Sequence, residues 1–211
     1  MADLQQEKGL VLDFLNNIDK AENKLLAETI SKYTSDDFHM RCTHPFNELK
    51  GADNVANDLW IPIKNSFKPI QRRMDIFYAG TNLIDNHSSK WVVNMGHLLG
   101  IFNNPFLGIV PTRKAVMLWY CEFYRVENNK ITEGAFFLDI LKFMQQLQLP
   151  IIPESTGMVG FNPGPMTHDG LYFNKQPEEE GQKTLDLMMR MANRLVGGGM
   201  KTTVPDLEKD W

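Results

Sequence analysis

The sequence predicts an α+β protein whose sheet is covered on both sides or curled around an interior. Three long segments, 91–102, 114–126 and 131–140, alternate between two sets of side chains with a period of two, which is typical of strands rich in β-branched and aromatic residues. Asn128 and Asn129 separate the last two segments, and because asparagine tolerates positive φ they predict a tight hairpin. Both faces of these strands are largely apolar, so we expect neither face to lie fully in water.

Two helices are expected before these strands. Residues 9–33 carry apolar side chains at helical spacing, with charged residues on the other face, so this helix should pack on the sheet. A second helix should follow Gly51. Pro62 falls inside that helix, which therefore either kinks there or divides into two short helices.

The connecting segments are less regular. We expect residues 39–49 to be irregular or a short strand, broken at Pro45, and residues 71–80 to form an alternating strand. The loop 103–113 contains apolar residues among prolines and glycines, which suggests that it covers a cavity or docks on a neighbouring subunit.

The character of the chain changes at Pro150. Residues 150–174 are rich in proline and glycine but poor in charge, so we expect an extended segment laid on a surface. A further amphipathic helix is predicted over 178–196, ending at the glycines 197–199. The sequence therefore predicts one domain over 1–149 and an extension over 150–211.

Composition restricts the class of partner. A net charge of −4 without a dense basic cluster disfavours a nucleic-acid partner. No apolar run approaches the roughly 18 residues that span a bilayer, and the N-terminus does not resemble a secretion signal. Cys42 and Cys121 form no recognisable framework, so we expect two reduced thiols in a cytoplasmic protein.

Asp139 is the first candidate for chemistry, because it stands where the last predicted strand ends and a helix begins. One interpretation is structural: an aspartate at this position caps the helix by accepting hydrogen bonds from free amides. The other is functional. A carboxylate facing an apolar interior has a raised pKa and can exchange protons with a carbonyl compound near neutral pH.

Histidines and charged strand residues are the other candidates. His97 lies mid-strand among apolar neighbours, and is either a core or pocket-lining histidine or a hydrogen-bond donor to a substrate oxygen. Glu122, Arg125 and Glu133 lie on the long strands, where a buried Arg–Glu pair is the simplest expectation and polar groups of a pocket are the alternative. The sequence shows no metal-binding motif, phosphate loop or GxSxG, so we expect neither a metal nor another cofactor.

Two runs carry a family resemblance: GHLLGIFNNPFLGIVPTRKAV and CEFYRVENNKITEGAFFLDILKFMQQL. They resemble the SnoaL-like polyketide cyclases, which belong to the nuclear-transport-factor-like α+β cone superfamily. The earlier stretches THPFNELKGADNVANDLW and FKPIQRRMDIFYAG are similar to the family as well, so the resemblance covers about residues 9–149. Arg113 and Gln148 depart from the family pattern, each replacing a usual glycine.

The resemblance implies a curled antiparallel sheet with N-terminal helices closing a conical, apolar pocket, plus a C-terminal extension. It also implies that Asp139 is the general acid/base of an aldol-type cyclisation. We therefore hypothesise cofactor-independent proton transfer on a small hydrophobic carbonyl compound, with Asp139 and His97 catalytic, in a homodimer. The candidate substrate-binding residues are Trp119, Tyr120, Tyr124, Phe137 and His44. Two alternatives are a hydrolase or isomerase on this fold, and a non-catalytic ligand-binding or dimer-forming module.

Overall fold

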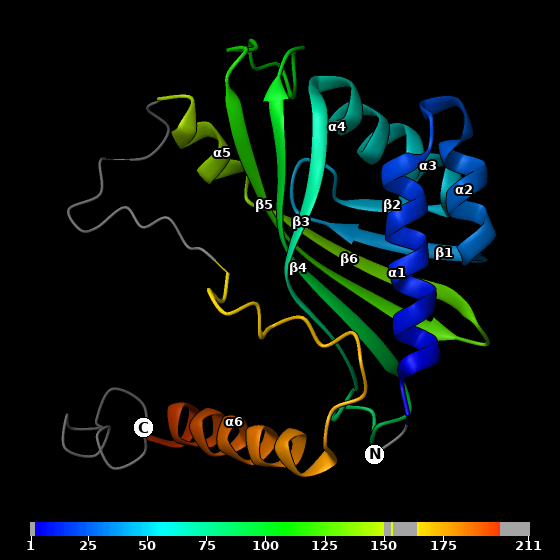
Figure 1. Ribbon diagram of the computed structural model, residues 1–211, viewed down its shortest axis with the longest axis vertical. Helices are drawn as coiled ribbons and strands as arrows, with labels where there is room; N and C mark the ends of the chain where they lie inside the picture. Colours follow the sequence, from blue (N-terminus) through cyan, green and yellow to red (C-terminus); the bar gives the residue numbers. More distant parts are fainter. Residues whose placement is uncertain (1–2, 150–152, 154–163, 199–211) are drawn as a thin grey trace. The chain divides into compact units, whose positions relative to one another are not determined.

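A six-stranded curled sheet in the order β2–β1–β6–β5–β4–β3 organises the chain (Figure 1). Neighbouring strands are antiparallel except β1 and β6, which are parallel. With helices on one side, this confirms the predicted α+β class. The strands are β1 (Thr34–Cys42), β2 (Glu48–Lys50), β3 (Phe67–Thr81), β4 (Lys90–Phe102), β5 (Ala115–Glu127) and β6 (Lys130–Leu138).

The computed structural model describes residues 3–149, 153 and 164–198. Contacts divide the chain into two units, of which one spans Asp3–Phe173 and contains the sheet. The other unit includes the helix α6 (Glu178–Gly198), where a helix was predicted. No described helix is long and apolar enough to cross a membrane.

The three long strands form where the alternation predicted them. Asn128 and Asn129 have φ of 48° and 60° and join β5 to β6 through a two-residue turn, since Glu127 pairs with Lys130. In this register Asn94 of β4 lies opposite Glu122 of β5. The hairpin prediction is confirmed, and the register brings these two polar side chains to the same face of the sheet.

The single helix predicted over 9–33 is wrong, because the chain breaks near Ala21. The observed elements are α1 (Gln5–Lys20), a 3₁₀ turn η1 (Asn23–Leu25) and α2 (Leu26–Tyr33). Ala21 is extended, with ψ of 138°. The Lys64 ammonium donates to the carbonyls of Ile18 and Ala21 at 2.7 and 2.6 Å, which satisfies acceptors that the end of α1 leaves free.

The second helix continues past its proline. It consists of α3 (Gly51–Asn54), a π-helical turn η2 (Val55–Trp60) and α4 (Ile61–Ser66). Pro62 lies in the first turn of α4, where its missing N–H is tolerated, and the π-helical turn precedes it. The helical run is therefore modified at Pro62 rather than ended.

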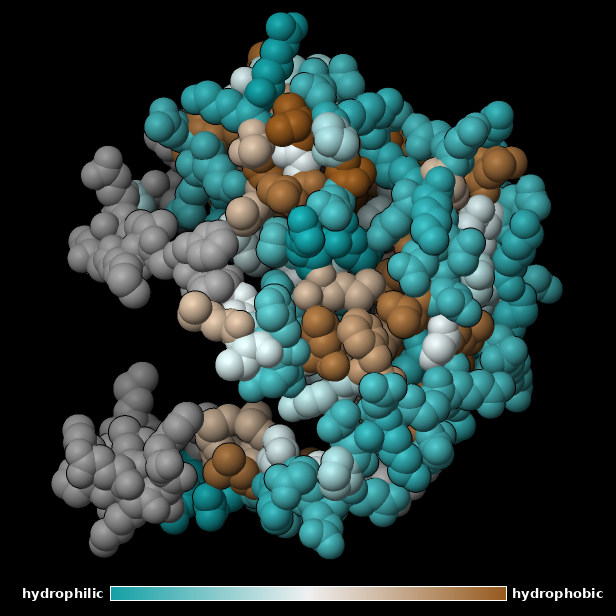
Figure 2. Space-filling view, viewed as in Figure 1, coloured by the Kyte–Doolittle hydropathy of each residue, from teal (hydrophilic) through white to brown (hydrophobic). Residues whose placement is uncertain are grey.

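The core lies between the helices α1 to α4 and the face of the sheet that they cover, which we call the inner face. Alternate residues of β5 are fully or almost fully buried there, and the outward sides of these helices are mostly hydrophilic (Figure 2). The opposite face, which we call the outer face, is only partly covered. The helix α5 (Ile140–Gln146) follows β6, and its Phe143 packs against Phe67, Phe102 and Phe106. Phe106 thus gives the apolar loop 103–113 a packing role.

The segment 164–173 contacts the edge of β3 through a bridge between Leu171 and Phe77, but it turns at 166–167 and 169–170 and so is not extended throughout, which differs from the prediction. The Phe77 amide donates to the Gly170 carbonyl at 2.8 Å, and the Tyr172 amide donates to the Phe77 carbonyl at 2.7 Å. The Lys8 ammonium donates to the Tyr172 carbonyl at 2.8 Å. Apart from Pro153, residues 150–163 lie outside the described part of the chain.

Candidate functional site

Polar side chains from β3, β4 and β5 lie close together on the inner face of the sheet. Arg72 of β3 donates through Nη1 to both carboxylate oxygens of Glu122 on β5, each at 3.0 Å. On its other side Arg72 donates through Nε and Nη2 to the two oxygens of Asp19, at 2.9 and 3.1 Å. The side chains of Arg72 and Glu122 are 3% and 0% exposed, so this is a buried ion pair linked to the surface through Asp19.

Aromatic rings enclose the guanidinium. The Arg72 carbon Cζ lies 5.1 Å from the ring centroids of both Trp60 and Tyr120, within the range of cation–π attraction. Asn94 of β4 donates through Nδ2 to the Tyr120 hydroxyl at 3.1 Å and to Glu122 Oε2 at 2.9 Å. We call these residues, with Tyr124, the inner cluster.

Burial and charge set the protonation of the inner cluster. Burial raises the pKa of Glu122, an effect that the Arg72 guanidinium partly offsets. Burial works against the charge on Arg72, but Glu122 and Asp19 hold the pKa of Arg72 well above its usual value. Burial also raises the pKa of Tyr120 and of Tyr124, so both hydroxyls remain protonated near neutral pH.

Three buried polar atoms of the inner cluster have no hydrogen-bond partner among the described residues. Two are donors, Trp60 Nε1–H and the Tyr124 hydroxyl, and the third is the acceptor Asn94 Oδ1. Trp60 is 2% exposed, and Tyr124 and Asn94 are 0% exposed. Buried polar groups are paired in the large majority of proteins, so three together need an explanation.

The sequence predicts part of the inner cluster, namely Tyr120 and Tyr124 as substrate-binding candidates and a buried Arg–Glu pair. Glu122 is in such a pair, but with Arg72 rather than with Arg125, whose Nη1 lies 3.2 Å from Glu133 Oε1. Alternation along 71–80 could have placed Arg72 on one face. Trp60, Asn94 and Asp19 gave no signal, because only the tertiary fold brings them together.

Asp139 occupies the N-cap of α5. Its Oδ1 accepts a hydrogen bond from the Lys142 amide at 2.9 Å, and the residue is exposed. This is the geometry of the structural interpretation. The catalytic role of Asp139 stays a prediction.

The remaining predicted residues lie away from the inner cluster. His97 is on the outer face, where its Nδ1 lies 3.5 Å from Asp75 Oδ2 and its ring 6.0 Å from that of Trp119. Phe137 is 51% exposed on the same face. Since successive residues of a strand point to opposite faces, Trp119 and Tyr120 cannot line one cavity inside the sheet.

His44 is exposed in the β1–β2 loop, at the same end of the sheet as Asp139. The preceding residue, Thr43, uses its hydroxyl to donate to the Leu138 carbonyl and to accept from the Leu138 amide, at 3.3 and 3.2 Å. The structure therefore places two predicted residues, His44 and Asp139, on neighbouring segments at the surface.

Other kinds of site find little support in the described chain. Burial raises the pKa of Cys42 to about 12 and also raises that of Cys121, so neither thiol is an activated nucleophile. Within residues 3–149, 153 and 164–198, no group of three or more His, Cys, Asp or Glu side chains is placed to hold a metal ion.

Two open hollows lie elsewhere on the unit. One, of about 570 Å³, lies between α1 and the β5–β6 hairpin, and the other, of about 500 Å³, lies beside Lys64 and Lys68. Neither is lined by a predicted site residue. The apolar pocket implied by the resemblance stays a prediction.

Comparison with known proteins identifies the fold of the chain. No protein-family model matches the chain, and no curated protein matches it. Among solved structures, AclR from Streptomyces galilaeus, provisionally described as a hydroxylase, is similar with a TM-score of 0.56 and 20% identity, over 72% of this chain and 87% of that one.

Two other solved structures agree. A protein from a Jannaschia species, provisionally described as a SnoaL-like polyketide cyclase, matches with a TM-score of 0.51 and 14% identity, over 67% of this chain and 94% of that one. An NTF2-like protein from Burkholderia thailandensis matches with a TM-score of 0.50 and 14% identity, over 68% and 97% of the two chains. The chain therefore has the α+β cone fold of the SnoaL-like and nuclear-transport-factor-like proteins.

Proposed function

We propose that the protein catalyses cofactor-independent proton transfer, of the aldol-cyclisation type, on a small hydrophobic carbonyl compound bound at the inner cluster. The observation that carries this proposal is a buried carboxylate, Glu122, in one cluster with two buried donors, Trp60 Nε1–H and the Tyr124 hydroxyl, that no described residue pairs with. The description of a fold neighbour as a SnoaL-like polyketide cyclase supports the substrate class.

The chemistry assigns each group a separate task. Glu122 takes a proton from the carbon next to the carbonyl, and its raised pKa brings it closer to the value that suits a base near neutral pH. Negative charge then develops on the carbonyl oxygen, which accepts hydrogen bonds from Trp60 and Tyr124 and is further stabilised by the Arg72 cation. The resulting enolate adds to a second carbonyl, and the proton returns from Glu122 to the new alkoxide.

Asp139 and His97, which the resemblance and the sequence suggested as catalytic residues, remain rival assignments for the proton transfer. Asp139 is exposed and caps α5, and His97 lies on the outer face. Glu122 is the fully buried carboxylate whose pKa burial raises, so we assign the proton transfer to Glu122.

The proposal can be tested without the natural substrate. Incubated with 2-acetonaphthone in D₂O, the protein is expected to exchange the methyl protons of this ketone for deuterium faster than buffer does. Glu122→Gln should lower the exchange rate by about 100-fold or more, the usual contribution of a general base. Asp139→Asn should change it less than threefold. The measurement is mass spectrometry of the recovered ketone.

Matched controls separate chemistry from folding. Glu28→Gln removes an exposed carboxylate on α2 that pairs with Lys32 at the surface, and should leave the rate unchanged. Tyr124→Phe deletes one unpartnered hydroxyl and should lower the rate while the thermal midpoint stays within a few degrees. If the ketone binds but does not exchange, the protein is a non-catalytic binding module; a loss confined to Asp139→Asn would restore Asp139 as the base.

We also propose that the protein forms a homodimer through the outer face. There Met95, Cys121 and Phe137 form one cross-strand row, and Met95 and Phe137 are 42% and 51% exposed. An exposed apolar row on a sheet is stabilised when a second copy covers it.

Sedimentation velocity tests the dimer. The wild-type chain should sediment as a dimer, and Phe137→Lys should shift it to the monomer because a charge would be buried in the interface. Ile84→Lys, at a residue that is 93% exposed in the β3–β4 loop, is the matched control and should leave the dimer intact. A wild-type monomer at micromolar concentration would rule the proposal out.

A further inference from the structure

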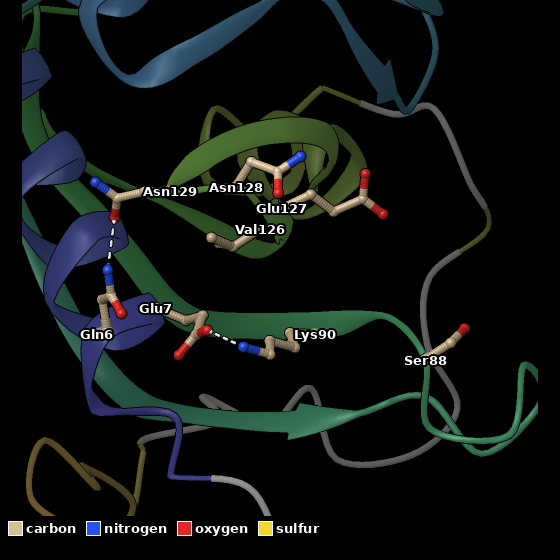
Figure 3. Close-up of a pocket in the computed structure, with 8 residues that line it drawn as sticks. All are labelled: Gln6, Glu7, Ser88, Lys90, Val126, Glu127, Asn128 and Asn129. Carbon is tan, nitrogen blue, oxygen red and sulfur yellow. Dashed lines mark hydrogen bonds and ion pairs between the residues drawn. The ribbon is translucent and has the colours of Figure 1, made fainter.

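We propose a second binding site, for a small hydroxylated amine such as an amino sugar, in the hollow of about 570 Å³ at the start of α1. Three segments line it: the first turn of α1, the start of β4 with Ser88 two residues before it, and the β5–β6 hairpin (Figure 3). It shares no residue with the inner cluster, so it is independent of the proposed reaction.

Glu7 is the central residue of this site. It is 7% exposed although it is ionisable, and its Oε1 lies 2.5 Å from the Lys90 ammonium. Its other oxygen, Oε2, is buried and has no hydrogen-bond partner among the described residues. A buried carboxylate oxygen without a donor is costly, so a ligand that brings an N–H or O–H donor into the hollow would be stabilised there.

The lining indicates which kind of donor fits. Among the described residues, the hollow is lined, besides Glu7, by the carboxylate Glu127 and by one cation, Lys90, which Glu7 already engages. The Arg125 guanidinium contacts Glu127 from outside the lining, so the hollow is not strongly acidic. What the described lining lacks is a donor for Glu7 Oε2, which an ammonium or hydroxyl group supplies and an anion does not, so a hydroxylated amine is favoured over an anion.

Amide and hydroxyl groups supply the rest of the lining. The Gln6 amide donates to Asn129 Oδ1 at 3.3 Å, which links α1 to the hairpin across the hollow (Figure 3). Asn128 and Ser88 complete the polar rim. The hydrogen bond from Gln6 orients the Asn129 side chain, and the amide groups of both asparagines can pair with the hydroxyls of a polyol.

The test uses glucosamine as the probe and the full-length protein. In two-dimensional ¹H–¹⁵N NMR at pH 7, glucosamine should produce saturable shifts at Glu7, Lys90 and the hairpin, with a dissociation constant of about 10 mM or lower. Glucose, which lacks the amine, should bind at least tenfold more weakly. Gluconate, an anion of similar size, should produce no saturable shift.

Two variants make the result decisive. Glu7→Gln should weaken glucosamine binding at least tenfold, whereas Glu28→Gln, which removes a carboxylate elsewhere on the surface, should not. Should Glu7→Gln fail to fold, Ser88→Trp changes an exposed rim residue and should abolish binding by filling the hollow. Equal affinity in wild type and Ser88→Trp, or no saturable shift by glucosamine, would overturn the site; the ketone exchange at the inner cluster is unaffected by either outcome.

Discussion

Arg72→Met is expected to lower the free energy of unfolding by about 3–5 kcal/mol, the usual cost of removing one partner from a buried ion pair. Glu122 is 0% exposed, and Arg72 supplies its cation at 3.0 Å. Without Arg72, the carboxylate must remain charged in the core or take up a proton. Equilibrium urea unfolding at pH 7 measures the loss.

The loss should depend on pH in a defined direction. In Arg72→Met, burial acts on Glu122 without an opposing cation, so the folded-state pKa lies above the ordinary 4.5 that applies in the unfolded chain. The folded state then binds the proton more tightly than the unfolded state does. The destabilisation is therefore smallest below about pH 4.5 and grows as the pH rises through the folded-state pKa.

The double variant Arg72→Met/Glu122→Leu distinguishes the cost of leaving Glu122 unpaired from the cost of changing residue 72 itself. It should recover much of the lost stability, because apolar residues of similar size often replace a buried ion pair at little cost. Lys32→Met, which breaks the exposed pair with Glu28, should cost less than about 0.5 kcal/mol. A loss below about 1 kcal/mol in Arg72→Met would contradict the importance of the pair.

Gly96→Ala is expected to destabilise the protein by about 3 kcal/mol, at the upper end of the cost of inserting one methyl group into a packed site. A Cβ at Gly96 would lie 2.0 Å from the Arg73 carbonyl oxygen and 3.1 Å from Met74 Cα. Both are backbone atoms beside the bulge between Met74 and Ile76, so no side chain can move aside. The strands β3 and β4 must separate locally, and this would shift the neighbouring Arg72.

Gly80→Ala is the matched control, because Gly80 lies on β3 and a Cβ there meets no atom within 4 Å. It should be neutral or slightly stabilising, since alanine restricts the unfolded chain more than glycine does. Urea unfolding of the two variants decides the point: similar midpoints for Gly96→Ala and wild type would mean that the strands do not approach as closely as described.

The inner cluster could be predicted only in part from the sequence. Alternation in 114–126 put Glu122, Tyr120 and Tyr124 on one face, and that grouping holds. It could not identify Arg72 as the partner of Glu122, because 50 residues separate them and two strand registers decide the pairing. Asp19 and Trp60 reach the same cation from helices, whose packing on the sheet has no local signature.

Asp139 illustrates the opposite case. The sequence predicts that Asp139 lies at a strand–helix junction and that it can cap the helix. Whether its carboxylate faces the interior or the solvent depends on the angle at which β6 and α5 meet. In the structure the carboxylate accepts a hydrogen bond from the Lys142 amide.

The sequence by itself determined the fold class, the three long strands, the Asn128-Asn129 turn and the helix after residue 178, because hydrophobic periodicity and turn chemistry are local properties of the chain. Only the tertiary structure decided which face of the sheet is covered, and hence that Glu122 is buried while His97 and Phe137 lie on the outer face. Both faces of the strands are apolar, so the pattern carried no information about which face the helices cover.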